Sequence, residues 1–236
     1  MLNPSSLVLE LGSGISALVG LLLAPRVARY VLTDQAYVAK LVEQNLAENR
    51  RRSALLGAAG SAKTTTTTAS RRSRANTPAG RRETAAAAAG DGAAALSKLH
   101  FTPLDWETDE VTSSLTGPGS EAKSFDVVLA CDCIYNEALV EPFVTTCVDL
   151  CRLRAAEAEA EAGSEAAGQA VEPTVCVVAQ HLRDPLVFEA WATRFTASFH
   201  TFRVPDEMLV PGLRSNSGFV VHVGVLRGGG INLEAV

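Results

Sequence analysis

The chain has 236 residues, of which 47% are hydrophobic, and a formal net charge of −5. This length and composition predict one globular domain with a substantial core, and the acidic balance argues against a core that binds nucleic acid. The charge is uneven, because residues 50–98 contain ten Lys/Arg and two Asp/Glu while the rest is acidic. We therefore expect an acidic body that attracts a basic protein substrate by electrostatic steering and needs no direct contact with nucleic acid.

The stretch from Leu7 to Ala17 begins as an apolar strand, passes through Gly12-Ser13-Gly14 and continues directly into a helical pattern. Gly12 permits a tight turn, and Gly14 lets a ligand approach the backbone because no Cβ is present. The spacing, with Ala17 in the last small-residue position, fits the dinucleotide-binding fingerprint, and a helix start offers free N–H groups to a polar or anionic ligand. A plain structural turn after a strand is the alternative.

Glu10 lies two residues before the first glycine, near the carboxyl end of what should be a central strand. A buried carboxylate is costly unless something pairs with it. A ligand with an ammonium or sulfonium charge would supply that partner, whereas a pyrophosphate would be repelled. Glu10 therefore favours S-adenosylmethionine over a nicotinamide dinucleotide. The apolar run 15–24 that follows is too short to span a bilayer and lacks a basic region before it, so we expect no membrane association.

The next predicted unit is a strand over residues 27–33 that ends at Asp34, followed by a helix over residues 35–49. An acidic residue at the end of the second strand of a doubly wound sheet can accept both ribose hydroxyls of an adenosine. Asp34 can also serve as the helix N-cap. The spacing predicts that the helix buries a stripe of four apolar residues. These are Val38, Leu41, Val42 and Leu46.

Residues 50–98 form a basic low-complexity segment with a run of five threonines and few large apolar side chains. Such a segment cannot bury enough surface to offset its ordering entropy, so we expect a disordered insertion between a helix and the third strand. Its basic clusters could contact ribosomal RNA or act as a localisation signal, and a tolerated solvated loop is the alternative. Residues 155–172, rich in Ala, Glu and Gly, predict a second low-complexity loop or a helix extension.

Two later strands end in candidate site residues. A strand over residues 99–104 leads into Trp106, whose ring could flank an adenine or serve as a core aromatic. A continuous apolar run over residues 125–132 predicts a buried parallel strand. If this is the fourth strand, it lies beside the first, at the switch point where open α/β sheets bind ligands. Asp132 and Tyr135 would then face the reactive end of the cofactor, and a strand-end turn with a surface Tyr is the alternative.

The remaining pattern predicts a helix over 137–154, a strand over 174–180, a helix over 184–199 and an antiparallel edge hairpin from 201–204 and 218–226. The four histidines show no metal-ligand spacing. The five cysteines, an odd number without framework spacing, predict free thiols in a reducing compartment and no metal site. These cysteines are Cys131, Cys133, Cys147, Cys151 and Cys176.

Four short motifs carry a family resemblance. In chain order they are Glu10-Leu11-Gly12-Ser13-Gly14, Leu32-Thr33-Asp34, Leu104-Asp105-Trp106 and Cys131-Asp132-Cys133-Ile134-Tyr135. Together they resemble the class I, seven-stranded S-adenosylmethionine-dependent protein lysine methyltransferases of the methyltransferase-like 21 group, above all the fungal ribosomal lysine N-methyltransferase 5 type. The resemblance covers most of the chain outside the two low-complexity segments. Its most specific motif is the Asp-x-x-Tyr at the end of the fourth strand.

The resemblance implies a single α/β domain over residues 1–236. Its Rossmann-like seven-stranded sheet would be mostly parallel, with an antiparallel last strand and helices on both faces. The candidate cofactor-binding residues are Glu10, Gly12, Ser13, Gly14, Asp34, Trp106 and Cys131. By resemblance, the glycine turn takes the methionine part of S-adenosylmethionine, Asp34 the ribose and Trp106 the adenine. The backbone around Cys131 would face the cofactor's reactive side, and Asp132 and Tyr135 would line the opening for the lysine. The implied substrate is a lysine of a large-subunit ribosomal protein, and we expect a cytoplasmic monomer.

Family members have a substantial segment before the first strand, with a Trp that closes over the cofactor. Only six residues precede Leu7 in this sequence, so we expect that segment to be lacking. An inactive or truncated homologue that serves as a ribosome-associated binding module is therefore one alternative. A nicotinamide-dependent oxidoreductase is another, because it would share the glycine turn and Asp34. It would leave Glu10 and the Asp-x-x-Tyr motif unexplained.

Overall fold

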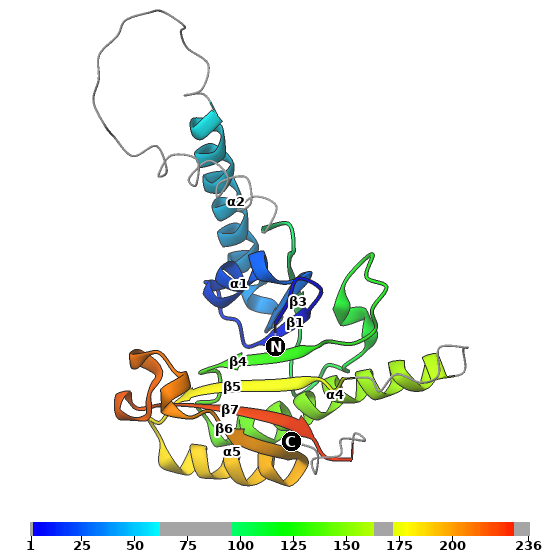
Figure 1. Ribbon diagram of the computed structural model, residues 1–236, viewed down its shortest axis with the longest axis vertical. Coiled ribbons are helices and arrows are strands. Elements are labelled where there is room, and N and C mark those ends of the chain that lie inside the picture. Colours follow the sequence, from blue (N-terminus) through cyan, green and yellow to red (C-terminus); the bar gives the residue numbers. More distant parts are fainter. Residues whose placement is uncertain (1, 62–95, 163–171, 229–236) are drawn as a thin grey trace, which may run out of the picture.

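The computed structural model describes residues 2–61, 96–162 and 172–228. These residues form one seven-stranded sheet with the order β3-β2-β1-β4-β5-β7-β6 (Figure 1). The strands are β1 (Leu7–Leu11), β2 (Arg29–Asp34), β3 (Leu99–Pro103), β4 (Val127–Cys131), β5 (Val175–His181), β6 (Phe199–Arg203) and β7 (Phe219–Leu226). The first five strands are parallel and β7 is antiparallel to both of its neighbours. The predicted fold class is confirmed.

β1 is the centre of the parallel part of the sheet, because it pairs with β2 on one side and β4 on the other. In this register Leu11 lies opposite both Thr33 of β2 and Ala130 of β4. The carboxyl ends of the three strands therefore meet at one edge. The strand order reverses at β1, so this edge is a topological switch point.

Helices cover the two faces unequally. α4 (Val140–Ala162) and α5 (Pro185–Ser198) lie on one face, while α1 (Leu18–Leu23) and α2 (Ala39–Ser61) lie against β1, β2 and β3 on the other (Figure 1). Continuous apolar runs in the central strands supply both cores, as expected for a parallel sheet covered by helices. Within the described ranges, no helix is both long and apolar enough to cross a membrane.

The helix after β2 differs from the prediction in two ways. It begins with a short 3-10 turn (Ala36–Val38) and α2 then runs on to Ser61, so residues 50–61 are helical and not part of a disordered insertion. The rest of the expected insertion, residues 62–95, lies outside the described residues. The predicted stripe is also partly wrong, because Leu41 is 47% exposed while Val38, Val42 and Leu46 are buried.

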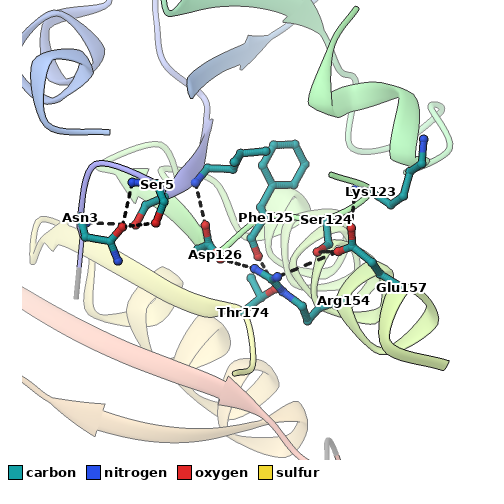
Figure 2. Close-up of polar contacts among 11 residues, drawn as sticks. Asn3, Ser5, Lys123, Ser124, Phe125, Asp126, Arg154, Glu157 and Thr174 are labelled. Carbon is teal, nitrogen blue, oxygen red and sulfur yellow. Dashed lines mark hydrogen bonds and ion pairs between the residues drawn. The ribbon is translucent and has the colours of Figure 1, made fainter. Parts of the chain in front are cut away.

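α4 likewise continues to Ala162, so residues 155–162 form a helix extension and not a loop. The extension is held at the amino edge of the sheet (Figure 2), where Glu157 accepts hydrogen bonds from Lys123 N–H at 2.6 Å and from the Ser124 hydroxyl. Next to it, Asp126 accepts from Leu7 N–H at 2.7 Å and pairs with Arg154. These long-range contacts are absent from a local composition pattern. Residues 163–171 of the expected loop lie outside the described residues.

The two C-terminal strands pair antiparallel at one edge of the sheet, as predicted, with β6 outermost. β7 lies between β5 and β6, and three short 3-10 turns connect β6 to β7. Under β7, the ring of Phe195 stacks between Trp191 and Phe199, with centroid distances of 5.0 and 4.3 Å. Gly224 of β7 faces this stack, and a Cβ there would lie 2.5 Å from Phe195 Cζ.

We predict that Gly224→Ala destabilises the protein by about 1–3 kcal/mol, because the fully buried Phe195 has no room to move away from the added methyl group. Urea unfolding followed by circular dichroism measures the change. The matched control is Gly212→Ala, in an exposed turn where an added Cβ has no atom within 4 Å. Equal stability of the two variants would contradict this account of the packing.

Candidate functional site

The glycine turn after β1 adopts the conformation that its sequence predicts. Gly12 and Gly14 both have φ of +64°, the left-handed region that favours glycine. A Cβ at Gly12 would lie 2.6 Å from Cys133 Cβ, whereas a Cβ at Gly14 would meet no atom within 4 Å. The turn therefore packs against the segment after β4 through Gly12 and leaves open space at Gly14.

The helix does not begin directly after the turn. α1 starts at Leu18 and has six residues, and Ala17 before it is itself left-handed with φ of 51°. The expected anion site at a helix start is therefore not formed here, because the helix is short and begins four residues beyond Gly14.

Asp34, at the end of β2, closes the turn. Its carboxylate accepts a hydrogen bond from Gly14 N–H through Oδ2 and another from Gln35 N–H through Oδ1, each at 2.8 Å. It does not cap α2, which begins five residues later. A carboxylate has about four lone-pair sites, so further acceptor capacity remains for hydroxyl groups. The negative charge beside the turn disfavours a pyrophosphate, in agreement with the expectation from Glu10.

A cleft of about 340 Å³ lies over this turn and the carboxyl ends of β1, β2 and β4. Its size is within the range of small-molecule sites. The residues that line it are Gly12, Gly14, Ile15, Asp34, Gln35, Tyr37, Val38, Leu104, Trp106, Asp132, Cys133, Tyr135 and Leu139. The structure thus brings together six of the nine predicted site residues.

The other three, Glu10, Ser13 and Cys131, do not line the cleft. The Ser13 N–H donates to Thr33 O at 3.0 Å, which ties the turn to β2. Cys131 is the last residue of β4, and burial raises the pKa of its thiol to about 11. All five cysteines are free, as predicted. Among the residues that the structure describes, no group of three or more His, Cys, Asp or Glu side chains could hold a metal ion.

Glu10 already has a partner within the protein, which the prediction of a cationic ligand beside it did not include. Its side chain is 2% exposed, and its Oε2 accepts a hydrogen bond of 2.8 Å from the Tyr30 hydroxyl on β2. Burial is the main cause that raises the Glu10 pKa from 4.5 to about 7, and the nearby Asp34 charge adds to the rise. The same environment raises the Tyr30 pKa, so Tyr30 remains a donor. The partner of Glu10 is thus an internal phenol.

Trp106 lies between the cleft and the core. Its ring contacts Phe143 of α4 edge-on, with centroids 5.3 Å apart, and its Cζ2 lies 3.4 Å from where a Gly12 Cβ would be. The indole N–H is buried without a hydrogen-bond partner. Trp106 therefore packs against the core and also lines the cleft, and its contact with an adenine stays a prediction.

Asp132, directly after β4, has a left-handed backbone with φ of 54°. This conformation is uncommon outside glycine, and Asp tolerates it better than most residues. The turn directs the carboxylate toward the end of β5. There it accepts from His181 N–H at 3.2 Å and forms an ion pair of 2.7 Å with Arg183 Nη2. The prediction did not include Arg183, although it follows the carboxyl end of β5 much as Asp132 follows that of β4.

Tyr135 contributes to two cavities. It is 71% exposed and belongs both to the cleft and to a neighbouring cavity of about 210 Å³ over the ends of β4 and β5. That second cavity is lined by Ile134, Tyr135, Gln180, His181, Arg183, Asp184, Val187 and Phe188. Asp132 and Tyr135 therefore stand at the boundary between a ligand-sized cleft and a smaller opening beside it.

A model of the family described as "Lysine methyltransferase" matches residues 84–157. The match includes Trp106, β4 and the Asp132–Tyr135 segment. Ribosomal lysine N-methyltransferase 5 of Zygosaccharomyces rouxii is 28% identical over 195 residues, which are 81% of this chain and 51% of that protein. The chain is therefore similar to lysine methyltransferases over these segments. It spans about half of the yeast protein.

A second curated protein, the diaminohydroxyphosphoribosylamino-pyrimidine deaminase of Schizosaccharomyces pombe, is 48% identical over only 48 residues, 20% of this chain and 12% of that protein. Among solved structures, the N-methyltransferase NodS of Bradyrhizobium japonicum with S-adenosyl-L-homocysteine superposes with a TM-score of 0.44 at 11% identity, covering 94% of this chain and 78% of NodS. The YcgJ protein of Bacillus subtilis gives 0.48 at 9% identity, covering 95% and 93%. Both superpositions are loose, so the class I methyltransferase fold rests on the strand order and not on them.

We predict that Glu10→Gln removes a pH dependence of stability. Between about pH 4.5 and 7 the folded protein keeps a proton on Glu10 that the unfolded chain has released, so the free energy of unfolding falls as pH rises through this window. Above pH 7 the loss is on the order of 3 kcal/mol. Glutamine still accepts from Tyr30 and carries no charge, so the variant should match wild type near pH 4.5 and exceed it above pH 7.

Urea unfolding of both proteins across this pH range measures the difference between their free energies of unfolding. The other carboxyl groups contribute equally to both proteins and therefore cancel in this difference. Glu43→Gln, on the exposed face of α2, is the control and should track wild type. A constant offset between Glu10→Gln and wild type at all pH values would show that folding does not shift the pKa of Glu10.

Proposed function

We propose that this protein is an S-adenosylmethionine-dependent protein lysine N-methyltransferase. The observation that carries the proposal is the convergence, in one cleft at the switch point, of the glycine turn, Asp34 and Trp106 with Asp132 and Tyr135. The match to the lysine methyltransferase family covers the segment with Trp106, Asp132 and Tyr135. The strand order and the name of the yeast relative support the same activity.

The residues of the cleft fit an adenosyl sulfonium ligand. Asp34 offers acceptor-only oxygens for ribose hydroxyls, Trp106 offers an aromatic wall for adenine, and the space at Gly14 lets a chain pass close to the backbone. Asp34 places an acidic side chain in the cleft, which suits a positive charge. When bound, this cofactor supplies an electrophilic methyl group.

The protein's part in the reaction is to orient a neutral amine. A lysine must lose a proton to solvent before its nitrogen can attack, and partial removal from water favours the neutral form. Asp132 accepts a hydrogen bond from the amine and so directs its lone pair, while the ring of Tyr135 packs along the aliphatic chain. Positioning of this kind needs no covalent intermediate on the protein.

The substrate that we propose is a basic protein of the large ribosomal subunit, met in the cytoplasm by a monomeric enzyme. The name of the yeast relative supports a ribosomal target. The acidic charge of the chain outside residues 50–98 is compatible with a basic partner. A nicotinamide-dependent reaction is less compatible, because Asp34 holds the Gly14 N–H that a pyrophosphate would need.

The first test is calorimetric titration with S-adenosylhomocysteine. We expect binding by the wild-type chain and at least about tenfold weaker binding by Asp34→Asn, because a charged acceptor for the ribose is lost. Asparagine can still accept from Gly14 N–H, although its amide nitrogen cannot replace the oxygen that accepts from Gln35 N–H. Glu43→Gln, which leaves the cleft unchanged, should bind as wild type. Undiminished binding by Asp34→Asn would place the ribose elsewhere.

A second test separates the chemical step from cofactor binding. Radiolabelled methyl transfer to isolated large-subunit ribosomal proteins should fall by at least about 100-fold in Asp132→Asn, because the amine loses its charged acceptor. Asparagine tolerates the left-handed backbone of Asp132, so S-adenosylhomocysteine binding should stay within about twofold of wild type. Equal losses of binding and transfer would mean that Asp132 supports the cleft and not the amine.

A further inference from the structure

Arg183 stands where it can control the charge of the amine site. Its Nη2 lies 2.7 Å from Asp132 Oδ2, and the two side chains are 54% and 39% exposed. An ion pair so exposed contributes little to stability. The left-handed backbone of Asp132 is itself unfavourable, and such local strain gathers at functional sites. The pair is therefore better explained by what it does at the boundary of the two cavities.

We infer that Arg183 is a positioning residue that neutralises Asp132, so that the site accepts a neutral lysine amine and rejects the ammonium form. This inference rests on the proposed function. An isolated carboxylate would bind the ammonium ion and hold its proton, which is the unreactive state for attack on a methyl group. A guanidinium on the same carboxylate repels a second cation and favours the uncharged amine.

The geometry leaves the amine a place on Asp132. Arg183 uses Oδ2 and the His181 N–H uses Oδ1, so two of about four lone-pair sites are taken. Arg183 remains in place while the amine donates to a free site. The proton that leaves the ammonium ion passes to bulk water before binding, and no group of the protein needs to store it.

Other ionisable groups around Asp132 restrict the pH range in which this effect is visible. The end of β4 and the segment after it contribute Cys131, Cys133 and Tyr135. The end of β5 and the segment after it contribute His181, Arg183 and Asp184. The neighbouring strands β1 and β2 contribute Glu10 and Asp34. Burial raises the pKa of Cys131 to about 11 and also raises that of Cys133, so both thiols stay neutral. Glu10, with a pKa of about 7, is ionised above that pH. Between about pH 8 and 9, these thiols and Glu10 therefore keep one protonation state, and the change that is observed is that of the amine.

The chain offers two convenient reporters. It contains three isoleucines, of which Ile15 lines the cleft and Ile134 lines the neighbouring cavity. In protein labelled with ¹³C at the isoleucine methyl groups, Ile15 reports S-adenosylhomocysteine binding and Ile134 reports the amine. The probe for the lysine side chain is n-butylamine, titrated into protein saturated with S-adenosylhomocysteine.

In the wild-type protein, the affinity for total n-butylamine should rise about tenfold from about pH 8 to 9, because only the neutral fraction binds. In Arg183→Gln the ammonium form should bind, so the affinity near pH 8 rises at least about tenfold and changes less than about twofold across the window. Arg183→Lys keeps the charge and should restore the wild-type slope. Arg203→Gln, which removes an equally exposed arginine paired with Asp206, should leave it unchanged.

Equal pH slopes in wild type and Arg183→Gln would overturn the inference, as would an Ile134 signal that n-butylamine does not move. Either result leaves the cofactor assignment intact if the Ile15 signal still responds to S-adenosylhomocysteine. Loss of that Ile15 response in the wild-type protein would instead contradict the proposed function.

Discussion

The pairing of β1 with both β2 and β4 is the constraint on which the site depends. Parallel strands in register end at the same edge, so one short central strand places the residues after three strand ends within reach of each other. Asp34 then ties the glycine turn to β2 through Gly14, and the segment after β4 packs on Gly12. Backbone pairing of the strands thus sets the position of the cleft, and the side-chain contacts hold the segments that line it.

Much of this arrangement could be predicted from sequence, because it rests on local signals. The strand-turn pattern at Gly12, the acidic end of β2 and the apolar run before Asp132 can each be recognised from neighbouring residues. Parallel topology then predicts that they meet at one edge of the sheet.

Long-range partners could not be predicted in this way. Tyr30 lies twenty residues from Glu10 and Arg183 lies fifty-one from Asp132. No spacing rule connects such pairs before the strand register is known. The continuation of α2 to Ser61 was not predicted. For residues 155–162, composition left a loop and a helix extension open, because it does not show that Glu157 is held by Lys123 and Ser124.

Two carboxyl groups near the same edge have opposite surroundings. Glu10 is sealed in the core beside a phenol, and desolvation raises its pKa toward neutrality. Asp132 is open to solvent and holds a guanidinium. Glu10 and Asp132 have similar intrinsic acidity, but burial and pairing give them different environments. Glu10 is thus a buried group paired inside the protein, whereas Asp132 can meet a molecule that enters from solvent.

The long helix α2 carries the chain away from this edge. Arg50 donates to the carbonyl oxygens of Leu96 and Leu99, which marks the amino edge of β3, and α2 continues past that point to Ser61 (Figure 1). The connection from α2 to β3 therefore leaves and rejoins the fold on the side opposite the cleft. Loop-closure entropy grows only slowly with length. In evolutionary terms, this makes the connection a permissive position, where residues can be gained or lost without changing the edge that forms the cleft.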